Sequence, residues 1–580
     1  MKSHHQRELA QQTLSREVGY VLKPHAGKLR VALIFPNTYF VGMSNLGFQT
    51  MYRLFNDQPD IVCERAFLPP KQELAALREA GTRIVTIESQ TPVGDFDVIA
   101  FSVSFEWDYT NVLTMLRLAG LPLRAADRDY THPLVVIGGA VTFVNPEPLA
   151  LFADVIAAGE GEELVPALLD AFGTSSRSEQ LQRLAQARGY YIPSFYDVEY
   201  KADGTIERFV AREGTGAPPV VKKAALKTTD AVDPPSTTIF TPDTEFGSRF
   251  LIEVVRGCAN LCRFCWAGYN YLPVRPFPTQ RILELAQQAR AHSAKAGLVS
   301  IALCDHPDIE HILRSLKEMG YSVSPASLRL DDLTPTIVTL LKESGERTLT
   351  IAPETGSDRL RRVINKTITN EEILDRAELI FSSGIESLKL YYMIGLPSEE
   401  DEDLVAIRDL TLQLHEIMLK HARPRGRIGR IVASVNPLVP KPGTAYQWLP
   451  MVRTDEIERK MKRMRSLVAD IDNVYFNIKS ERHSYYQALL SLGDRRIAPV
   501  IELAEANGGQ WRKAVADSGV DGDFYIYRDR SNDSVLPWSM IDGGMKDNFF
   551  RAEYDKSTRA EWTLPPKRAK ENARLLPVLS

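Results

Sequence analysis

Three of the five cysteines in this 580-residue chain lie within one stretch of eight residues: Cys258, Cys262 and Cys265. A curled loop with this spacing can direct all three thiolates toward one inorganic cube, and iron–sulfur clusters take thiolate ligands. A cube with three protein ligands keeps one iron open for chemistry. A structural zinc site would need a fourth ligand, which Cys304 or His306 would have to supply. Three unrelated buried cysteines are the remaining alternative.

The composition is that of an ordinary soluble globular protein, with 44% hydrophobic and 25% charged residues. The length predicts about two to four domains. A net charge of −4 gives no sign of a nucleic-acid partner. The N-terminus lacks the apolar segment of a secretory signal, and no apolar run is long enough to span a membrane. With so few cysteines, these features predict a cytoplasmic protein without a membrane partner.

Short apolar runs alternate with segments of helical spacing in the first third of the chain. We predict buried strands at Val31–Pro36, Val98–Phe105, Leu134–Ala140 and Val155–Gly159. This alternation predicts an α/β fold with a doubly wound, Rossmann-like parallel sheet and ligands beyond the carboxyl ends of its strands. We place this domain at 31–171, after a helical leader at 1–30.

A connector and a second α/β unit follow. The connector, 172–246, shows strand-like alternation, a hairpin turn at Ala202-Asp-Gly204 and proline-rich linkers, so we expect a small β region. The second unit, 247–450, is expected to form a partial (β/α)6 barrel of the TIM type. Its predicted strands are Phe250–Val255, Leu298–Leu303, Ser322–Ser327, Thr348–Ala352, Ser387–Tyr392 and Ile428–Val435.

Two helices of this second unit have recognisable start signals. Thr369 and Glu372 form a predicted capping box, and Gly384 supplies the stop. Another helix is expected to begin at Ser398, where acidic residues favour the positive end of the helix dipole. The remaining segment, 451–580, is expected to be a mainly helical extension that ends in a basic, polar tail.

The Cys-x3-Cys-x2-Cys signature, with Phe264 before its last cysteine, resembles that of the radical S-adenosylmethionine (SAM) superfamily. The resemblance implies a 4Fe-4S cluster whose open iron chelates the amino and carboxylate groups of SAM. One electron, from a donor such as flavodoxin or ferredoxin, then cleaves a sulfur–carbon bond to give a 5′-deoxyadenosyl radical. The protein holds and shields these cofactors. The nearby aromatics Trp266, Tyr269 and Tyr271 either pack in the core or line a cofactor wall.

Other strand ends resemble the superfamily's SAM-binding segments. The resemblance assigns SAM binding to Asp305 after the second strand, Glu354 and Ser357 after the fourth, Gly395 after the fifth and Asn436 after the sixth. Structural alternatives exist for several of them. Glu354 could be a helix-start acid, Gly395 could merely end a strand, and Asn436 could belong to a proline-rich exit loop.

A doubly wound sheet ahead of such a unit resembles the cobalamin-binding (B12-binding) class of the superfamily, and Gly493-Asp-Arg-Arg496 resembles a branch of fused cobalamin and radical proteins. Small residues at strand ends would let the backbone approach the macrocycle and its nucleotide tail. The likeness assigns cobalamin binding to Asn37, Tyr39, Gly42, Met43, Ser102, Ser104, Gly138, Gly139, Gly159, Glu160 and Gly161. The alternative is a domain that binds another nucleotide, or none.

The chain lacks the Asp-x-His-x-x-Gly loop with which many cobalamin domains supply a histidine to cobalt. Asn37–Gly42 takes the corresponding place. The lower position of cobalt is therefore expected to be open, or filled by water or by a side chain such as Tyr39 or Met43.

The leading interpretation is a radical SAM methyltransferase in which the adenosyl radical removes hydrogen from an unactivated carbon and methylcobalamin donates the methyl group. The alternatives are a radical oxidation or rearrangement with non-methylating cobalamin, and a non-catalytic iron–sulfur electron-transfer module. The substrate stays open among small molecules, peptides and RNA, and no RNA-binding motif supports the last. No catalytic side chain is singled out.

Overall fold

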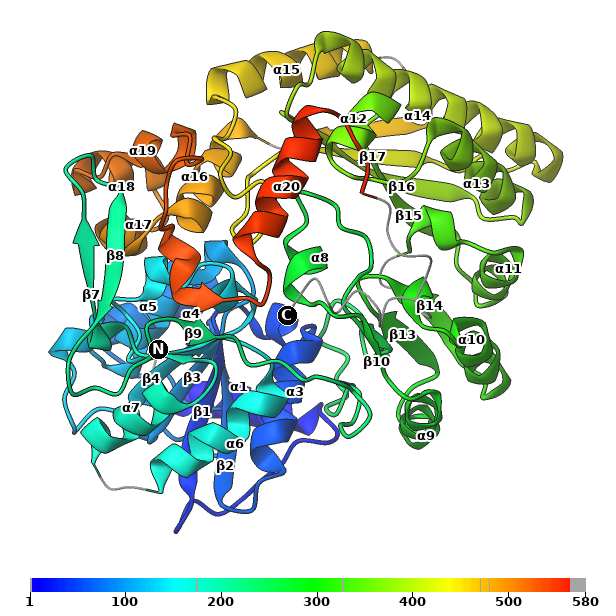
Figure 1. The fold of residues 1–580 in the computed structure, drawn as a ribbon. Helices are drawn as coiled ribbons and strands as arrows, with labels where there is room; N and C mark the ends of the chain where they lie inside the picture. Colours follow the sequence, from blue (N-terminus) through cyan, green and yellow to red (C-terminus); the bar gives the residue numbers. More distant parts are fainter. Residues whose placement is uncertain (1–2, 174–175, 326–327, 470, 479, 564–580) are drawn as a thin grey trace.

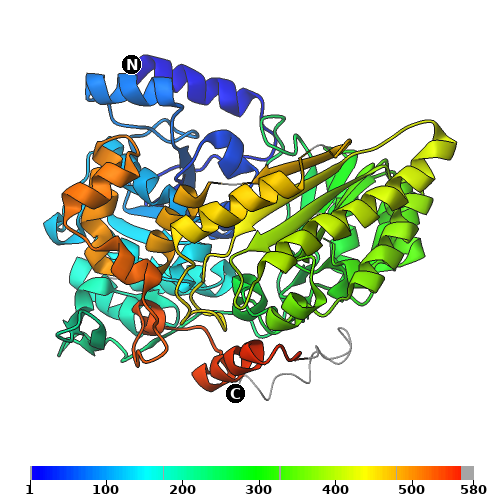
Figure 2. The same cartoon turned by 90° about the horizontal axis from the view of Figure 1, so that it is seen from above.

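The computed structural model describes residues 3–173, 176–325, 328–469, 471–478 and 480–563. Figure 1 shows two α/β units side by side, with the C-terminal helices packed across them. In the perpendicular view of Figure 2, α1 (Ser3–Ser15) and α20 (Asp547–Thr558) lie on opposite sides of the molecule. Among the described helices, none combines the length and the apolar character that crossing a membrane requires.

The N-terminal unit is built on one six-stranded sheet with the order β2-β1-β3-β4-β5-β6. Its first five strands are parallel, and β6 pairs antiparallel with β5. The order reverses between β1 and β3, where doubly wound sheets bind ligands. The strands are β1 (Leu29–Phe35), β2 (Ile61–Phe67), β3 (Val98–Ser102), β4 (Leu134–Gly138), β5 (Val155–Ala157) and β6 (Tyr190–Tyr191).

Helices cover both faces of this sheet, which explains why its strands are apolar throughout. Residues of α3 and α6 pack with one set of strand side chains, and those of α5 pack with the other. The helices of the unit are α2 (Tyr39–Met43), α3 (Leu46–Asn56), α4 (Lys71–Ala80), α5 (Tyr109–Ala119), α6 (Gly161–Phe172) and α7 (Arg177–Gln186).

Strand β2 was not predicted, because charged residues interrupt its apolar pattern. Glu64 and Arg65 lie in its centre and are buried. Arg65 is fully buried and pairs with Glu17 (2.7 Å) and Glu88 (2.7 Å). Buried charges are tolerated when they are paired in this way, so the strand keeps its place in the sheet.

The connector differs in part from the expected β region. Its predicted hairpin is confirmed: β7 (Tyr196–Tyr200) pairs antiparallel with β8 (Ile206–Ala211). Before the hairpin, however, lie helix α7 and strand β6, which complete the N-terminal unit. Ser176 caps α7 by accepting a hydrogen bond from the Glu179 amide, a Ser-x-x-Glu start signal that the sequence already contained. A short strand, β9 (Val221–Lys222), follows.

The second unit contains seven parallel strands in two hydrogen-bonded sheets, β10-β13-β14 and β15-β16-β17-β18. Residues 326–327, the end of one predicted strand, lie outside the described residues. The sheets comprise β10 (Phe250–Glu253), β13 (Lys295–Val299), β14 (Ser322–Pro325), β15 (Thr348–Glu354), β16 (Ser387–Ile394), β17 (Ile431–Pro437) and β18 (Val474–Ile478). A separate ribbon joins β11 (Val255–Arg256) and β12 (Arg275–Pro276).

Helices lie between the strands of this unit. The capping box of α13 at Thr369 and Glu372 is confirmed, and Gly384 follows its end with a φ of +97°. Helix α14 begins at Asp401 instead of Ser398, because Glu400 and Asp403 form its capping box. The helices are α8 (Trp266–Asn270), α9 (Thr279–Ala289), α10 (Ile309–Glu318), α11 (Pro335–Glu343), α12 (Asp358–Val363), α13 (Asn370–Ser382) and α14 (Asp401–Ala422).

The C-terminal extension is mainly helical as predicted, but it also contributes β18 to the second sheet. Its Ser491 hydroxyl donates to Glu106 of the N-terminal unit (2.7 Å), and Lys441 of the second unit pairs with the same carboxylate. The extension therefore joins both units. It comprises α15 (Thr454–Leu467), α16 (Glu481–Leu492), α17 (Ala498–Ala506), α18 (Trp511–Ser518), α19 (Gly522–Tyr527), β19 (Ile541–Asp542) and α20; the predicted polar tail at 564–580 lies outside the described residues.

Candidate functional site

The three clustered cysteines lie on one loop, 257–265, between β11 and α8; we call it the cysteine loop. Gly257 starts it with a φ of +95°, and a side chain there would meet the Tyr271 carbonyl at 2.6 Å. Cys258 and Cys262 are buried, and Cys265 is half-buried. Burial raises the pKa of the Cys258 thiol to about 11 and that of the other two thiols as well. The thiolate form therefore needs a positive partner, which iron would provide.

Two basic side chains approach the cysteine loop from segments that follow β14 and α12. Arg329 lies 4.0 Å from the Cys258 sulfur and pairs with Asp305 (2.9 Å), which also accepts a hydrogen bond from the Ala259 amide (3.1 Å). Lys366 interacts electrostatically with Cys262 and Cys265 and pairs with Glu354 (3.2 Å). These cations would offset the negative charge of a thiolate-bound cluster.

Arg263, which lies between Cys262 and Cys265 in the sequence, anchors the cysteine loop to other parts of the chain. It is fully buried and pairs with Glu553 of α20 (3.1 Å). Its remaining donors reach the backbone carbonyls of Arg362 (2.7 Å), Val363 (2.9 Å) and Glu561 (2.8 Å). We call Arg263, Glu553 and these carbonyls the C-terminal clamp. It fixes the backbone between two cysteines to a helix far away in the sequence.

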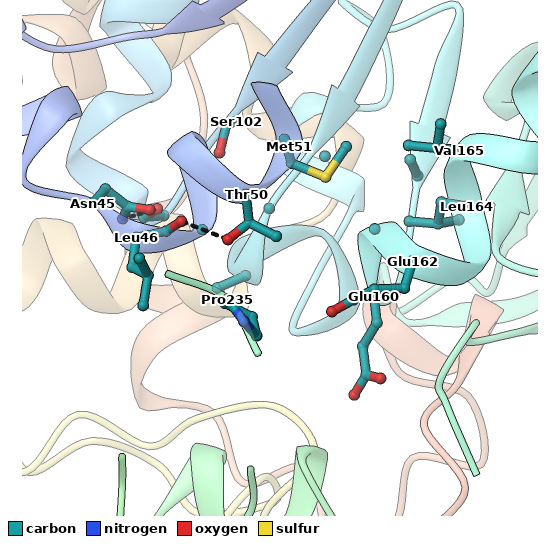
Figure 3. Close-up of a pocket in the computed structure, with 18 of the residues that line it drawn as sticks. Asn45, Leu46, Thr50, Met51, Ser102, Glu160, Glu162, Leu164, Val165 and Pro235 are labelled. Carbon is teal, nitrogen blue, oxygen red and sulfur yellow. Dashed lines mark hydrogen bonds between the residues drawn. The ribbon is translucent and has the colours of Figure 1, made fainter. Parts of the chain in front are cut away.

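A cavity of about 550 Å³ lies between the two units; we call it the interdomain cavity. Figure 3 shows Asn45 to Met51 of the α3 segment on one side and Glu160 to Val165 on the other. The second unit contributes residues of β10, β11 and β13. The cavity thus extends from the carboxyl ends of the N-terminal strands to the strand that leads into the cysteine loop.

A buried ion network connects the two walls of this cavity. Arg256, two residues before Cys258, pairs with Glu160 (3.1 Å), Glu162 (3.0 Å) and Glu253 (2.8 Å). Arg275 pairs with the other Glu160 oxygen (2.7 Å). Burial opposes ionisation of Glu160, but the hydrogen bonds from Arg275 and the charge of Arg256 hold its pKa below the ordinary value. The network fixes the cavity wall relative to the cysteine loop.

Two family models match this chain: "Radical SAM proteins, N-terminal" over residues 47–193, and "Radical SAM superfamily" over residues 252–411. The second range contains the whole cysteine loop, and the two ranges together take in more than half of the chain. This chain belongs to the radical SAM superfamily.

Three proteins illustrate how similar this chain is in sequence or in fold to known proteins. "Uncharacterized protein MJ0966" of Methanocaldococcus jannaschii is 26% identical over 482 residues, 82% of this chain and 91% of its own length. "Uncharacterized methyltransferase PH0819" of Pyrococcus horikoshii is 23% identical over 286 residues, 47% of this chain and 56% of its own. The structure of the radical SAM methyltransferase TsrM from Kitasatospora setae, with cobalamin and a [4Fe-4S] cluster bound, has a TM-score of 0.49 at 13% identity, covering 92% of this chain and 99% of that one.

The thiols fit the cluster that this radical SAM family implies better than they fit a zinc ion. Both ring nitrogens of His306 are engaged: Nε2 with the Phe277 carbonyl (2.9 Å) and Nδ1 with the Asp308 amide (3.1 Å). Throughout the described ranges, no three His, Cys, Asp or Glu side chains are placed to hold one metal ion. In a four-iron cube each thiolate binds a different iron, so its ligands stand farther apart than those of one ion.

The structure brings two of the five predicted SAM residues to the cysteine loop. Asp305 is the hydrogen-bond acceptor for the loop backbone, and Glu354, at a φ of +66°, pairs with Lys366 beside the thiols. Burial raises the pKa of Glu354, and the charge of Lys366 opposes that shift. Both carboxylates have ionic partners in this structure.

The other three predicted SAM residues lie at strand or helix ends. Ser357 caps α12 by accepting a hydrogen bond from the Leu360 amide (3.3 Å). Gly395 follows β16, and its amide donates to Glu399 (2.9 Å). Asn436, near the end of β17, has a buried Oδ1 without a hydrogen-bond partner in the described structure. An unsatisfied buried oxygen favours a bound donor at that position.

Seven of the eleven predicted cobalamin residues line the interdomain cavity together: Ser102, Ser104, Gly138, Gly139, Gly159, Glu160 and Gly161. They follow β3, β4 and β5, whose carboxyl ends meet at one sheet edge. Gly139 has a φ of +101°, and a side chain there would meet the Val103 carbonyl at 2.3 Å. The positive φ and the close approach of the Val103 backbone therefore require glycine at this strand end.

The other four lie outside the residues that line this cavity, and each has a structural role. Tyr39 donates to Glu17 (2.5 Å), and the Met43 sulfur accepts from Arg65 (3.3 Å), so both belong to the charge cluster around β2. A side chain at Gly42 would collide with Phe67 at 2.5 Å. The Asn37 amide donates to Asp108 (2.8 Å).

Several residues that line the interdomain cavity were not predicted from the sequence. Thr50 and Met51 lie on α3, and Pro235 and Glu253 come from segments far away in the sequence. Periodic spacing shows that α3 is amphipathic, but nothing in it shows which side chains meet a second unit. Tyr271, one of the three aromatics left open above, lines the cavity, while Tyr269 is buried in the core.

Asp108 gives a pH prediction for the N-terminal unit. Burial raises its pKa from 3.8 to about 6, and hydrogen bonds from Asn37 and Asn111 only partly compensate. The folded protein therefore binds this proton more tightly than the unfolded chain, and the free energy of unfolding falls as pH rises from about 4 to 6. We expect Asp108→Asn, which keeps an acceptor oxygen, to stabilise the protein at pH 7 by about 1–3 kcal/mol.

Thermal denaturation of the wild type and Asp108→Asn at pH 4 and pH 7 measures this effect. Asp108→Asn should be more stable than the wild type at pH 7, and most of this difference in stability should disappear at pH 4. A variant that is equally stabilised at both pH values, or not stabilised at pH 7, would contradict the raised pKa of Asp108. Asp57→Asn, at the exposed end of α3, is the surface control for the same substitution.

Proposed function

We propose that this radical SAM enzyme cleaves SAM reductively at a 4Fe-4S cluster bound by Cys258, Cys262 and Cys265, and that it methylates an unactivated carbon with the help of cobalamin. One observation carries the cobalamin part of the proposal. The interdomain cavity is walled on one side by the strand ends of a doubly wound sheet and on the other by Arg256, two residues before the first cluster cysteine. A cofactor there would lie beside the site of radical formation.

The size and the lining of the interdomain cavity suit part of a corrin ring with its nucleotide tail. A volume of about 550 Å³ accommodates a drug-sized group and not a whole cobalamin, so the remainder would extend out of the cavity. Gly138, Gly139 and Gly159 line the cavity, and at Gly138 the absence of a side chain leaves room for a flat ligand. No histidine occurs among the described residues that line the cavity. We propose that this chain gives cobalt no histidine, and no ligand from Tyr39 or Met43.

The protein side chains position and shield the reacting groups. When bound, the cluster supplies the electron that breaks a sulfur–carbon bond of SAM, and cobalamin carries the methyl group. Arg329 and Lys366 stabilise the thiolates, and the C-terminal clamp holds the loop. The unpaired Asn436 oxygen would accept a hydrogen bond from SAM. We propose further that the two sheets of the second unit act as one partial barrel around SAM, and that a flavodoxin- or ferredoxin-like donor supplies the electron.

Methyl-labelled SAM tests the reaction. The reconstituted enzyme, with a low-potential reductant and a substrate panel, should form methylated product, with one SAM yielding S-adenosylhomocysteine and another yielding methionine and 5′-deoxyadenosine. Formation of 5′-deoxyadenosine with unlabelled products would instead show oxidation or rearrangement. An absence of SAM cleavage would leave an electron-transfer module.

A cavity-filling substitution tests the cobalamin site separately. A side chain at Gly138 is sterically allowed, because its Cβ would make only ordinary contacts, at 3.7 Å, with Ala157 and Phe101. Gly138→Leu should fill the cavity, lower cobalamin binding by at least about tenfold and leave the iron content unchanged. Cobalt analysis after reconstitution measures the effect, with Gly173→Leu at the exposed end of α6 as the control. Undiminished cobalt binding in Gly138→Leu would exclude this cavity.

A further inference from the structure

One face of the second sheet is uncovered. Along β15 to β18, alternate residues pack against the helices, whereas the residues between them face away from that core. Figure 1 shows α13 and α14 on the outer side of β15, β16 and β17. We call the opposite side the inner face. Neighbouring strands align its residues in rows: Thr350, Lys389, Val432 and Tyr475 in one, and Tyr391, Ser434 and Asn477 in the next.

The inner face is polar and aromatic, yet its side chains make few contacts. Tyr391 is 44% exposed and Tyr475 is 56% exposed, so both large rings are open to solvent on the uncovered face. Lys389 and Asn477 are also exposed. None of these four has a side-chain hydrogen bond or ion pair to any residue that the structure describes. Together with the unpaired oxygen of Asn436, they gather aromatic rings, an amide and an amine on one face of the sheet.

The inner face is continuous with the cluster site. Met393 lies on it, two residues after Tyr391, and packs in the same apolar cluster as Phe264 of the cysteine loop. Lys389 comes four residues before Met393, about 13 Å nearer the amino end of the strand. It is therefore too deep for the SAM carboxylate, which the cluster iron would hold at the other end.

The charge of the inner face is positive. Lys389 shares its row with Thr350, Val432 and Tyr475, none of which is acidic. Glu354, at the carboxyl end of β15, pairs with Lys366. Lys389 is thus left without a carboxylate in its row, and an anion would complement it.

We propose that the inner face binds the substrate of the proposed reaction, and that this substrate is a small molecule with a planar ring and a carboxylate or phosphate, anchored by Lys389. The inference rests on the proposed function. Tyr391 and Tyr475 supply ring faces, Asn477 supplies amide hydrogen bonds, and Lys389 fixes the anionic end. The anchored end would lie deep in the unit, and the remainder would extend toward the cluster.

Binding of model anions to the reconstituted holoenzyme with SAM tests this site. The probes are 2-naphthoate, its neutral amide 2-naphthamide, and phenyl phosphate, measured by ligand-observed NMR. We expect the two anions to bind more tightly than the amide. Lys389→Ala should weaken anion binding by about tenfold, Lys389→Arg should restore it, and Lys462→Ala on the outer helix α15 should leave it unchanged. The relative affinities of 2-naphthoate and phenyl phosphate identify the preferred anion.

The proposal is overturned if no probe binds, if 2-naphthoate and its amide bind equally, or if Lys389→Ala binds the anions like the wild type. Formation of 5′-deoxyadenosine without substrate is measured in the same preparations. Wild-type and Lys462→Ala enzymes should both cleave SAM to the same extent. A loss of SAM cleavage in the wild type would count against the proposed function, whereas a loss of anion selectivity alone would count against the substrate class.

Discussion

Cys262→Ala is expected to abolish SAM cleavage, lowering 5′-deoxyadenosine formation by roughly 10³-fold or more, because the three thiolates act as one unit. Two thiolates cannot hold the cube in the geometry that leaves a single iron open. The iron content and the visible absorption of the reconstituted protein should fall in parallel. Liquid chromatography of the reaction under strictly anaerobic conditions measures the nucleoside.

Two other cysteines make this prediction specific. Cys63 is buried in β2, far from the cysteine loop in the sequence, so Cys63→Ala should keep both iron and SAM cleavage. Cys304→Ala distinguishes the three-thiolate cluster from a site with a fourth cysteine. It should retain its iron, whereas loss of the metal in Cys304→Ala would revive the four-ligand alternative. A Cys262→Ala enzyme that still cleaves SAM would refute the cluster assignment.

The second large effect concerns the C-terminal clamp. Glu553→Ala leaves the fully buried Arg263 without its counter-ion, so we expect the free energy of unfolding to fall by about 3–5 kcal/mol. Because Arg263 lies between Cys262 and Cys265, the same change should speed the loss of iron to a chelator. Thermal denaturation and the rate of iron release measure the two consequences.

A double variant separates a positioning role from simple loss of stability. Arg263→Met with Glu553→Leu removes both charges and should recover much of the stability. Iron release should stay fast in the double variant if Arg263 positions the loop. It should return to the wild-type rate if the clamp acts only through overall stability. The exposed pair of Asp401 and Arg459 is the control, and Asp401→Ala should hardly affect either measurement.

The sequence predicted those parts of the fold that depend on local patterns. The strands β1, β3, β4 and β5 and the capping box of α13 are encoded by nearby residues, and they appear where expected. Strand β2 was missed because Arg65 becomes compatible with a sheet only through the distant carboxylates of Glu17 and Glu88. Glu64 likewise depends on distant partners, among them His25 and Thr86. Strand β18 was missed because it joins the sheet from a segment whose sequence pattern otherwise predicts helices.

The same distinction applies to the candidate site. The cysteine spacing is local and predicted the loop, and the glycines after β4 and β5 predicted one wall of the cavity. The opposite wall and the C-terminal clamp depend on contacts between residues far apart, such as Arg263 and Glu553. No periodicity encodes such pairs. For Tyr39 and Met43, whose place after β1 suggested a cobalt ligand, the structure shows contacts with the buried charges Glu17 and Arg65, which no local pattern encodes.

We propose that one chain holds a four-iron cluster and a cobalamin side by side. Quantification of iron, sulfide and cobalt after anaerobic purification and reconstitution with hydroxocobalamin tests this arrangement. We expect about four iron, about four sulfide and about one cobalt per chain. Iron and sulfide without cobalt would refute the assignment of cobalamin to the interdomain cavity, and a protein that retains no iron would refute the cluster on the cysteine loop.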